Sequence, residues 1–151
     1  MEESRRRFLA RIGTTAAAGC ILATLGGCSD GEGQSPATGP VPAGNVKDLA
    51  KGTVKFVSGK PVILGRDDQG VYALSSICTH DQCDMSKNGT IGTDTIQCDC
   101  HGSRFDKNGK VTKGPASSDL DHYKVEIAAN GDITVQASEK VAATARTAVP
   151  G

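Results

Sequence analysis

The sequence predicts an all-β domain that carries its cysteine and histidine residues on two loops. Between residues 46 and 137, short apolar or alternating runs are separated by tight turns, and no sustained helical period occurs there. Four of the six cysteines and two of the three histidines lie between positions 78 and 101. Trp is absent and Gly is abundant, so the core is thin. A small domain with a thin core usually needs a metal or a disulfide for stability.

The expected strands are short and rich in apolar and β-branched residues. In chain order they are residues 53–57, 61–65, 71–75, 95–97, 122–128 and 132–136. Turn signals separate or follow them at residues 58–60, 67–70, 88–89, 108–109 and 130–131. Asn-Gly at 130–131 lies between two alternating runs and predicts a hairpin. This arrangement leaves the Cys/His residues on loops between strands.

The overall charge argues against nucleic-acid binding. Lys and Arg together number 17, as do Asp and Glu, so there is no basic footprint for nucleic acid. No Ser/His/Asp arrangement and no carboxylate pair is evident, and we assign no catalytic residue. Any turnover would belong to a larger assembly.

The N-terminal segment, residues 1–28, has the pattern of an export signal. Residues 4–9 (SRRRFL) resemble the twin-arginine signal, and an uncharged stretch follows at 12–27. This stretch is shorter than the ~20 apolar residues that span a bilayer. Residues 25–28 (LGGC) resemble a lipobox, which implies lipidation of Cys28. The alternative is an uncleaved signal that serves as an anchor. Both readings predict a domain on the periplasmic or extracytoplasmic face of a membrane.

Two further segments are expected to lie outside the folded domain. Residues 29–45 are rich in Gly, Pro, Ser and Ala and lack large apolar side chains, which is typical of a flexible linker. Residues 138–151 show no clear strand pattern and are expected to be a disordered tail. The folded domain is therefore predicted over residues 46–137.

Two short boxes carry the chemistry, residues 78–83 (CTHDQC) and 98–103 (CDCHGS). Each offers one Cys and one His at close spacing, plus a second Cys. Two thiolates with two imidazoles suit either tetrahedral zinc or an iron–sulfur centre. Zinc sites more often pair Cys with Cys and His with His at fixed spacing. A mixed pair from each of two loops is what a Rieske centre uses, where two His replace two Cys on one iron.

The boxes resemble the Rieske [2Fe–2S] family, whose pattern is Cys-Thr-His-x-x-Cys followed by Cys-x-Cys-His-Gly-Ser. Every fixed position of that pattern is met. Residues 104–106, the Gly-Pro-Ala at 114–116, Leu120 and Tyr123 also match, so the resemblance covers roughly residues 50–136. It implies an antiparallel β sandwich with a two-loop cluster-binding subdomain and one [2Fe–2S] cluster per chain.

The resemblance also assigns roles to six residues of the two boxes. Cys78 and Cys98 would be thiolate ligands of the buried iron, and His80 and His101 would be imidazole ligands of the outer iron. Cys83 and Cys100 would form a disulfide. Export to an oxidising compartment permits such a disulfide.

Five more positions are expected to surround the cluster. By resemblance, the Ser103 hydroxyl donates to a cluster sulfide, and Phe105 stands where the family has a second donor, a Tyr. Asp81 stands where proteins of bc complexes usually have an apolar residue. Gly102 would permit close backbone approach, and Pro115 belongs to a loop that covers the cluster. Phe105 and Asp81 together predict a reduction potential below that of respiratory bc-complex Rieske proteins and above that of oxygenase ferredoxins.

The resemblance implies one-electron transfer, with quinol, cytochrome b or a redox enzyme on one side and a c-type cytochrome on the other. The chain would be an electron-transfer protein or an oxidoreductase subunit. The alternatives are the small subunit of a periplasmic oxidoreductase such as arsenite oxidase, an oxygenase-type ferredoxin and a zinc-stabilised binding domain. Ferredoxins of that type generally lack the Cys83 and Cys100 pair. The third histidine, His122, matches no motif and is expected at the surface.

Overall fold

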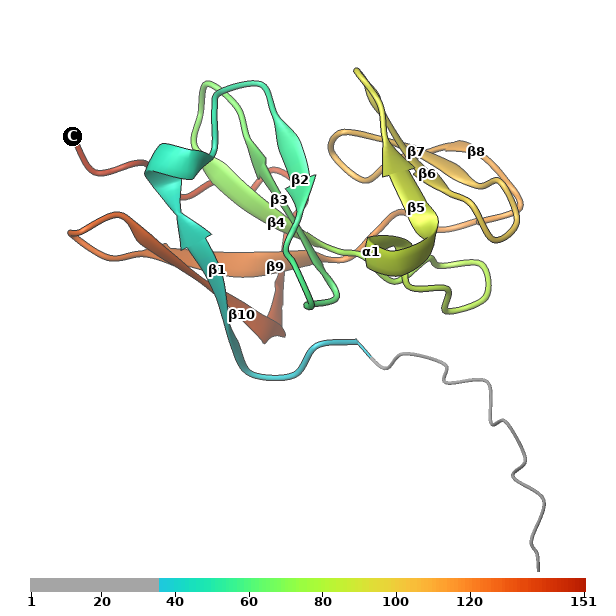
Figure 1. The fold of residues 1–151 in the computed structure, drawn as a ribbon, viewed down its shortest axis with the longest axis horizontal. Helices are drawn as coiled ribbons and strands as arrows, with labels where there is room; N and C mark the ends of the chain where they lie inside the picture. The colour runs from blue at the N-terminus through green and yellow to red at the C-terminus, as the bar shows by residue number, and fades with distance from the viewer. Residues whose placement is uncertain (1–35) are drawn as a thin grey trace, which may run out of the picture. The chain divides into compact units, whose positions relative to one another are not determined.

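A computed structural model of the chain describes residues 36–151, and most of its strands form one antiparallel sheet (Figure 1). In spatial order, the six strands are β1 (Pro40–Asn45), β10 (Asp132–Val141), β9 (His122–Ile127), β4 (Val71–Ser75), β3 (Val62–Arg66) and β2 (Val54–Phe56). A short 3-10 helix, η1 (Val46–Asp48), follows β1. Five of these strands were expected from the sequence; β1 was not.

The six-stranded sheet curls around a first apolar core. Strands distant in the sheet order, such as β1 and β3, contribute side chains to the same core, among them Val41, Val62, Leu64, Tyr123 and Val135. The alternate residues of β3 and β4 point the other way and are also buried, among them Ile63, Tyr72 and Leu74. A strand that is buried on both faces reads as a continuous apolar run, which explains the pattern of residues 61–65.

A second antiparallel sheet covers that other face. It has the order β5 (Gly89–Ile91), β6 (Thr95–Cys98), β7 (Arg104–Asp106) and β8 (Val111–Lys113), and one helical turn, α1 (Met85–Asn88), precedes β5. Met85, Ile96 and Phe105 are fully buried and pack with Ile63 and Leu74 of the first sheet. The expected all-β fold of antiparallel strands is confirmed, and the second core holds the base of both Cys/His loops.

Strand β1 corrects the expected linker. Residues 40–45 lie inside the segment predicted to be flexible, yet Pro40 pairs with Gln136 and Val41 with Val135 of β10. Val41 and Ala43 are buried while their neighbours are exposed. Small apolar side chains at alternate positions therefore suffice for an edge strand. Proline is tolerated there because the free edge needs no hydrogen bonds.

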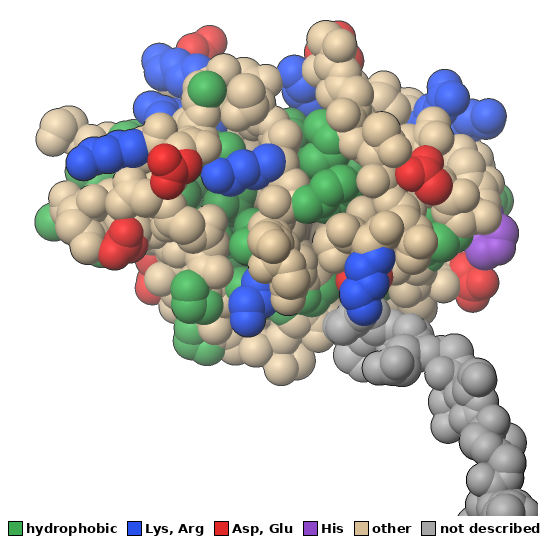
Figure 2. Space-filling view, in the orientation of Figure 1, with side chains coloured by type: hydrophobic (Ala, Val, Ile, Leu, Met, Phe, Trp, Pro, Cys, Tyr) green, Lys and Arg blue, Asp and Glu red, His purple; other side chains and the backbone are tan. Residues whose placement is uncertain are grey.

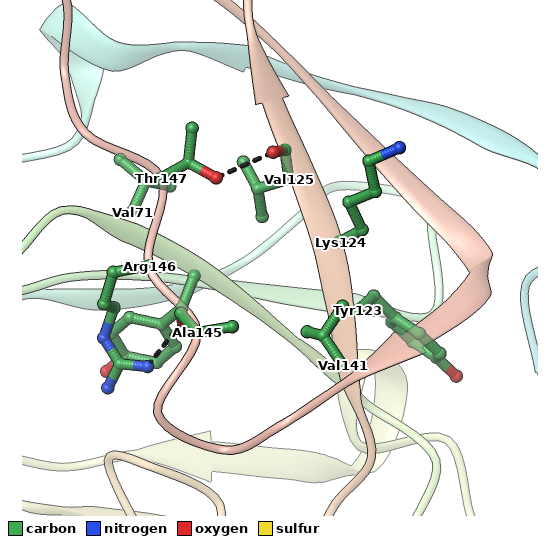
Figure 3. Close-up of a pocket in the computed structure, with 9 residues that line it drawn as sticks. Val71, Tyr123, Lys124, Val125, Val141, Ala145, Arg146 and Thr147 are labelled. Atoms are coloured by element: carbon green, nitrogen blue, oxygen red, sulfur yellow. Dashed lines mark hydrogen bonds between the residues drawn. The ribbon is translucent and has the colours of Figure 1, made fainter.

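The C-terminal segment corrects the expected tail. Strand β10 continues to Val141, and Thr147 exchanges both backbone hydrogen bonds with Val71 at 2.9 Å. Thr147 Oγ1 also donates to the carbonyl oxygen of Val125 at 2.7 Å (Figure 3). Figure 3 shows the part of this segment that contains Thr147 beside Val71 of β4 and Val125 of β9. The segment is held mainly by polar contacts, so no apolar period reveals it in the sequence.

Arg146 anchors that segment to both sheets. Its Nε lies 2.5 Å from Asp67 Oδ2, its Nη2 donates to Asn108 Oδ1 at 2.7 Å, and its guanidinium lies 4.0 Å from the centre of the Tyr72 ring. Burial alone would raise the pKa of Asp67, but hydrogen bonds from Arg146 and from backbone amides outweigh it and lower the pKa. The side chain of Arg146 is only 12% exposed. It therefore belongs to the fold rather than to a frayed end.

The expected export signal and the lipidation site Cys28 lie outside the described residues. Within residues 36–151, no helix is both long and apolar enough to cross a membrane.

Candidate metal centre

The two Cys/His loops close in the same way. Loop 1, residues 78–83, follows β4, and loop 2, residues 98–103, joins β6 to β7. In each loop the amide of the first Cys donates to the carbonyl five residues further on. Cys78 donates to Cys83 at 2.8 Å, and Cys98 donates to Ser103 at 2.9 Å. The same backbone frame therefore holds both loops, although their sequences differ.

The fifth position of each loop has a left-handed backbone. Gln82 has φ 52° and Gly102 has φ 77°, and each donates its amide to the carbonyl of the first Cys, at 3.1 and 2.9 Å. A Cβ on Gly102 would meet no atom within 4 Å. Glycine at this position therefore serves the backbone conformation. Loop 1 carries the less suitable Gln at the matching position.

The first position of each loop buries a thiol. Cys78 and Cys98 are 1% and 0% exposed, carry no disulfide, and lie near enough for their thiols to interact. Burial raises the pKa of the Cys98 thiol, and the neighbouring Cys78 raises it further. The common loop frame thus brings two sulfur donors together inside the second core.

The imidazoles lie outside that sulfur pair. His80 and His101 are exposed, and their ring centres lie 5.0 Å apart with planes at 75°. Figure 2 shows histidine at the surface of the end of the molecule that carries the second sheet. The two loops therefore present sulfur donors in the interior and nitrogen donors at the surface.

The remaining two loop cysteines form the disulfide that the sequence predicted. Cys83 and Cys100 are bonded, with Cα atoms 6.6 Å apart. Their sulfur atoms and that of Cys98 all lie within 4.8 Å of one another. Because two of these three sulfurs are paired with each other, only Cys98 of this group is left as a metal donor. The disulfide joins loop 1 directly to loop 2.

A third segment, residues 114–118, fastens to both loops. The amide of Ala116 donates to Ser103 Oγ at 3.0 Å, and Thr79 Oγ1 donates to the carbonyl of Ser118 at 2.5 Å. Pro115 is exposed beside them, after a cis peptide bond with Gly114. This is the segment in which the sequence predicted a covering loop.

The donor set fits a mixed-ligand iron–sulfur cluster. Two buried thiols lie together and two imidazoles lie together, which matches a cluster with sulfur ligands on one iron and nitrogen ligands on the other. The model of the Rieske [2Fe-2S] domain family matches residues 39–124, more than half of the chain. The chain belongs to this family. Its cofactor is a Rieske [2Fe–2S] cluster.

Several known proteins resemble this Rieske domain. It is 39% identical over 85 residues to the cytochrome b6-f complex iron-sulfur subunit of Synechococcus sp. (strain RCC307), a match that covers 53% of this chain and 47% of the relative. The subunit of Prochlorococcus marinus (strain MIT 9515) is 35% identical over 89 residues, covering 57% and 49%. The chain thus spans about half the length of these curated relatives.

A solved structure confirms the fold. A chain in the complex of reduced oxygenase and oxidized ferredoxin in carbazole 1,9a-dioxygenase aligns with a TM-score of 0.51 and 27% identity. The alignment covers 70% of this chain and 99% of that chain. The Rieske fold of two antiparallel sheets is therefore established for the described residues.

Two residues expected near the cluster of the Rieske domain have contrasting surroundings. Phe105 is fully buried in the second core, whereas Asp81 is exposed in loop 1. Asp106 caps the turn that follows it, because its Oδ1 accepts the amides of Asn108 and Lys110 at 2.8 and 2.9 Å.

The expectation for His122 was wrong, because this residue is only 5% exposed. Its ring stacks on Tyr72, and its Nε2 lies 2.9 Å from the carbonyl of Asn108. Within residues 36–151, its buried Nδ1 has no hydrogen-bond partner. Burial lowers the pKa of His122, which the bond to Asn108 opposes only in part. The neutral imidazole is thus part of the junction between the two sheets.

A polar network beside loop 2 was missed. Asp99 accepts hydrogen bonds from Thr90 Oγ1 at 2.9 Å and Gln97 Nε2 at 2.8 Å, and Arg104 Nε donates to Gln97 Oε1 at 2.9 Å. These side chains join β5, β6 and β7 outside the Rieske core and hold the second residue of loop 2. In the sequence these residues are only alternating polar positions on short strands. The network depends on how β5, β6 and β7 pair, and the sequence does not show that register.

Proposed function

We propose that Cys78 and Cys98 bind one iron of the cluster and that His80 and His101 bind the other. One observation carries this assignment: two buried thiols that form no disulfide lie together, and beside them are two exposed imidazoles. The ring centres of these imidazoles are 5.0 Å apart. When bound, a cluster of this kind accepts and releases one electron at a time. Neutral imidazoles in place of two thiolates make its reduction easier.

The site has a buried side, which holds the thiols, and a solvent-exposed side, which holds the imidazoles. Met85, Ile96 and Phe105 are fully buried around the thiols and keep water from the sulfur donors. The two imidazoles reach solvent, so a redox partner can approach them without a change in the fold. The Cys83–Cys100 disulfide keeps the loops together at that surface.

We further propose a donor and an acceptor class for the electrons. The chain passes single electrons from quinol, beside a cytochrome b, or from another redox enzyme, to a c-type cytochrome. Support comes from the 39% identity to a cytochrome b6-f complex iron-sulfur subunit and from the disulfide pair, which the family resemblance links to quinol-oxidising complexes.

A second candidate function is supported by the structural similarity to a chain in an oxygenase–ferredoxin complex. In that role the chain would carry electrons to an oxygenase inside the cell. The disulfide argues for an oxidising compartment instead, because cytosolic thiols are kept reduced. The location of the protein decides between the two.

The leader supports a location outside the cytoplasmic membrane. We propose that residues 4–9 direct twin-arginine export and that lipid on Cys28 tethers the domain to the outer face. Cell fractionation of Cys28→Ser tests the tether, with Cys20→Ser as the matched control in the same leader. The control stays in the membrane fraction and Cys28→Ser is released. Retention of Cys28→Ser contradicts lipid anchoring and favours an uncleaved signal anchor.

The ligand set is tested with matched histidine variants. His80→Gln removes a proposed ligand, whereas His122→Gln alters the one histidine outside the loops. After purification, His80→Gln should lack the visible absorbance and the electron paramagnetic resonance (EPR) signal of the cluster, and His122→Gln should keep both. Stopped-flow reduction by a quinol analogue and oxidation by a c-type cytochrome then test the partners. A cluster that survives in His80→Gln would refute the ligand set.

A further inference from the structure

A buried carboxylate follows loop 1 directly. Asp84 is 7% exposed and lies at the N-cap of α1. Its Oδ1 accepts three hydrogen bonds, from Ser76 Oγ at 3.0 Å, from the Ser86 amide at 3.0 Å and from Ser86 Oγ at 2.7 Å. Hydrogen bonds to an ionised acceptor are stronger than those between neutral groups. This cluster lies outside the proposed ligands and outside the disulfide.

These contacts tie together the two ends of loop 1. Ser76 precedes the loop and Ser86 follows it, so one carboxylate oxygen spans the loop base. The backbone reinforces the closure, because Met85 donates its amide to the Ser76 carbonyl at 2.9 Å and Ile77 forms a bridge with Asp84. The base of loop 1 is therefore closed independently of the disulfide.

The helical turn that Asp84 caps also reaches loop 2. Asn88, the last residue of α1, donates its amide to the Asp84 carbonyl at 3.0 Å and accepts the amide of Asp99 at 2.9 Å. The next residue, Gly89, pairs with Cys98 in the register of β5 and β6. One short path of hydrogen bonds thus runs from Asp84 through α1 to the first two residues of loop 2.

We propose that Asp84 is a positioning residue for the cluster: it fixes loop 1 and, through α1, sets the spacing between the two loops. It acts through Cys78 and Cys98, which it holds side by side, and it is not one of the proposed ligands. The proposal rests on the ligand set proposed above. Residues that orient metal ligands contribute to metal retention although they do not bind the metal.

The test compares four purified full-length variants with the wild-type protein: Asp84→Ala, Asp84→Asn, Ser76→Ala and the control Asp68→Ala. Asp68 is an exposed acid whose ion pair with Lys51 is 3.7 Å long. The readouts are the rate at which visible absorbance is lost in the presence of an iron chelator, the EPR line shape and the thermal midpoint of unfolding. Asn keeps an acceptor oxygen and is as good an N-cap as Asp, so it serves as the conservative rescue.

Asp84→Ala should lose its cluster about 10- to 100-fold faster than the wild-type protein and show a broadened EPR line. Asp84→Asn should restore both properties, and Asp68→Ala should match the wild-type protein. If Asp84→Ala lowers the thermal midpoint but keeps the wild-type loss rate and line shape, the residue is only structural and the proposal is wrong.

Ser76→Ala covers the case in which Asp84→Ala does not fold, because it removes one of the three hydrogen bonds. An intermediate loss rate supports the proposal, and a wild-type rate overturns it. Failure of the ligand set gives a different result, since the cluster would then survive in His80→Gln.

Discussion

The amide of Ala116 donates to the hydroxyl oxygen of Ser103 at 3.0 Å, and both residues are buried. Ser103 closes loop 2, while Ala116 belongs to the segment that carries Pro115. Because the hydroxyl oxygen is used as an acceptor by the protein, its proton is directed elsewhere. This agrees with the role that the family resemblance gives to this hydroxyl, donation to a cluster sulfide. One side chain therefore supports both the covering segment and the expected tuning of the cluster.

Replacing Ser103 with Ala should lower both the free energy of unfolding and the midpoint potential of the cluster. The buried Ala116 amide would lose its acceptor, which costs about 1–3 kcal/mol of unfolding free energy. Loss of the hydroxyl donor should also lower the midpoint potential. Urea denaturation and protein-film voltammetry measure the two effects. The exposed Ser117→Ala is the control and should change stability by less than about 0.5 kcal/mol. An unchanged potential in Ser103→Ala would contradict the donor role.

The common loop frame predicts opposite effects at its two left-handed positions. Gln82→Gly should raise the unfolding free energy by about 0.5–1 kcal/mol, because glycine adopts positive φ without steric cost. Gly102→Ala should lower it by about 1 kcal/mol, although the added methyl group has open space. Chemical denaturation of both variants checks this. Equal signs for the two changes would show that the loops do not share one backbone frame.

The missing hydroxyl at Phe105 predicts the direction of a potential change. Phe105→Tyr should raise the midpoint potential, since a hydrogen-bond donor would be restored at the position where the family has Tyr. Protein-film voltammetry measures it, with Phe56→Tyr as the control from β2, which packs against the same core. The control should leave the potential unchanged. If Phe105→Tyr folds and its midpoint potential does not rise, the missing hydroxyl does not lower the potential of the wild-type protein.

Burial of His122 predicts a loss of stability in mild acid. Its folded pKa is lowered by burial and by Arg146, while the Asn108 carbonyl, Asp106 and Asp119 oppose this shift. The folded state therefore disfavours the protonated ring. Stability from this residue is complete above its unfolded pKa of about 6.5 and declines as the pH falls below that value.

Unfolding free energies measured between pH 8 and pH 5 should show this decline in the wild-type protein. The decline should be smaller in His122→Gln, which does not titrate. An identical slope in the two proteins would mean that other groups carry the pH dependence.

The sequence alone predicted the features that depend on residues close together in the chain. The two boxes, the disulfide pair and the Asn-Gly hairpin turn depend on residue types at short spacing, and the disulfide was confirmed by the structure. Strand β1 was missed because Val41 and Ala43 are small and separated by a proline, so their burial depends on β10, about ninety residues away. Helical turn α1 was missed because four residues show no period, and its cap at Asp84 depends on Ser76.

Contacts between distant residues explain the other differences. The C-terminal segment is held by the guanidinium of Arg146 on Tyr72 and Asp67, and nothing near Arg146 in the sequence indicates those partners. His122 was expected at the surface because it follows Asp121 at the start of a strand. Its face of β9 is covered by the second sheet, which the strand pattern alone does not position.

Metal and sulfide analysis of the purified full chain shows whether the two loops hold the cluster. A Rieske [2Fe–2S] cluster should give about two irons and two acid-labile sulfides per chain. After reduction it should also give an EPR signal with an average g value below that of the free electron. One zinc per chain, with no labile sulfide and no such signal, would contradict the assignment of the cluster.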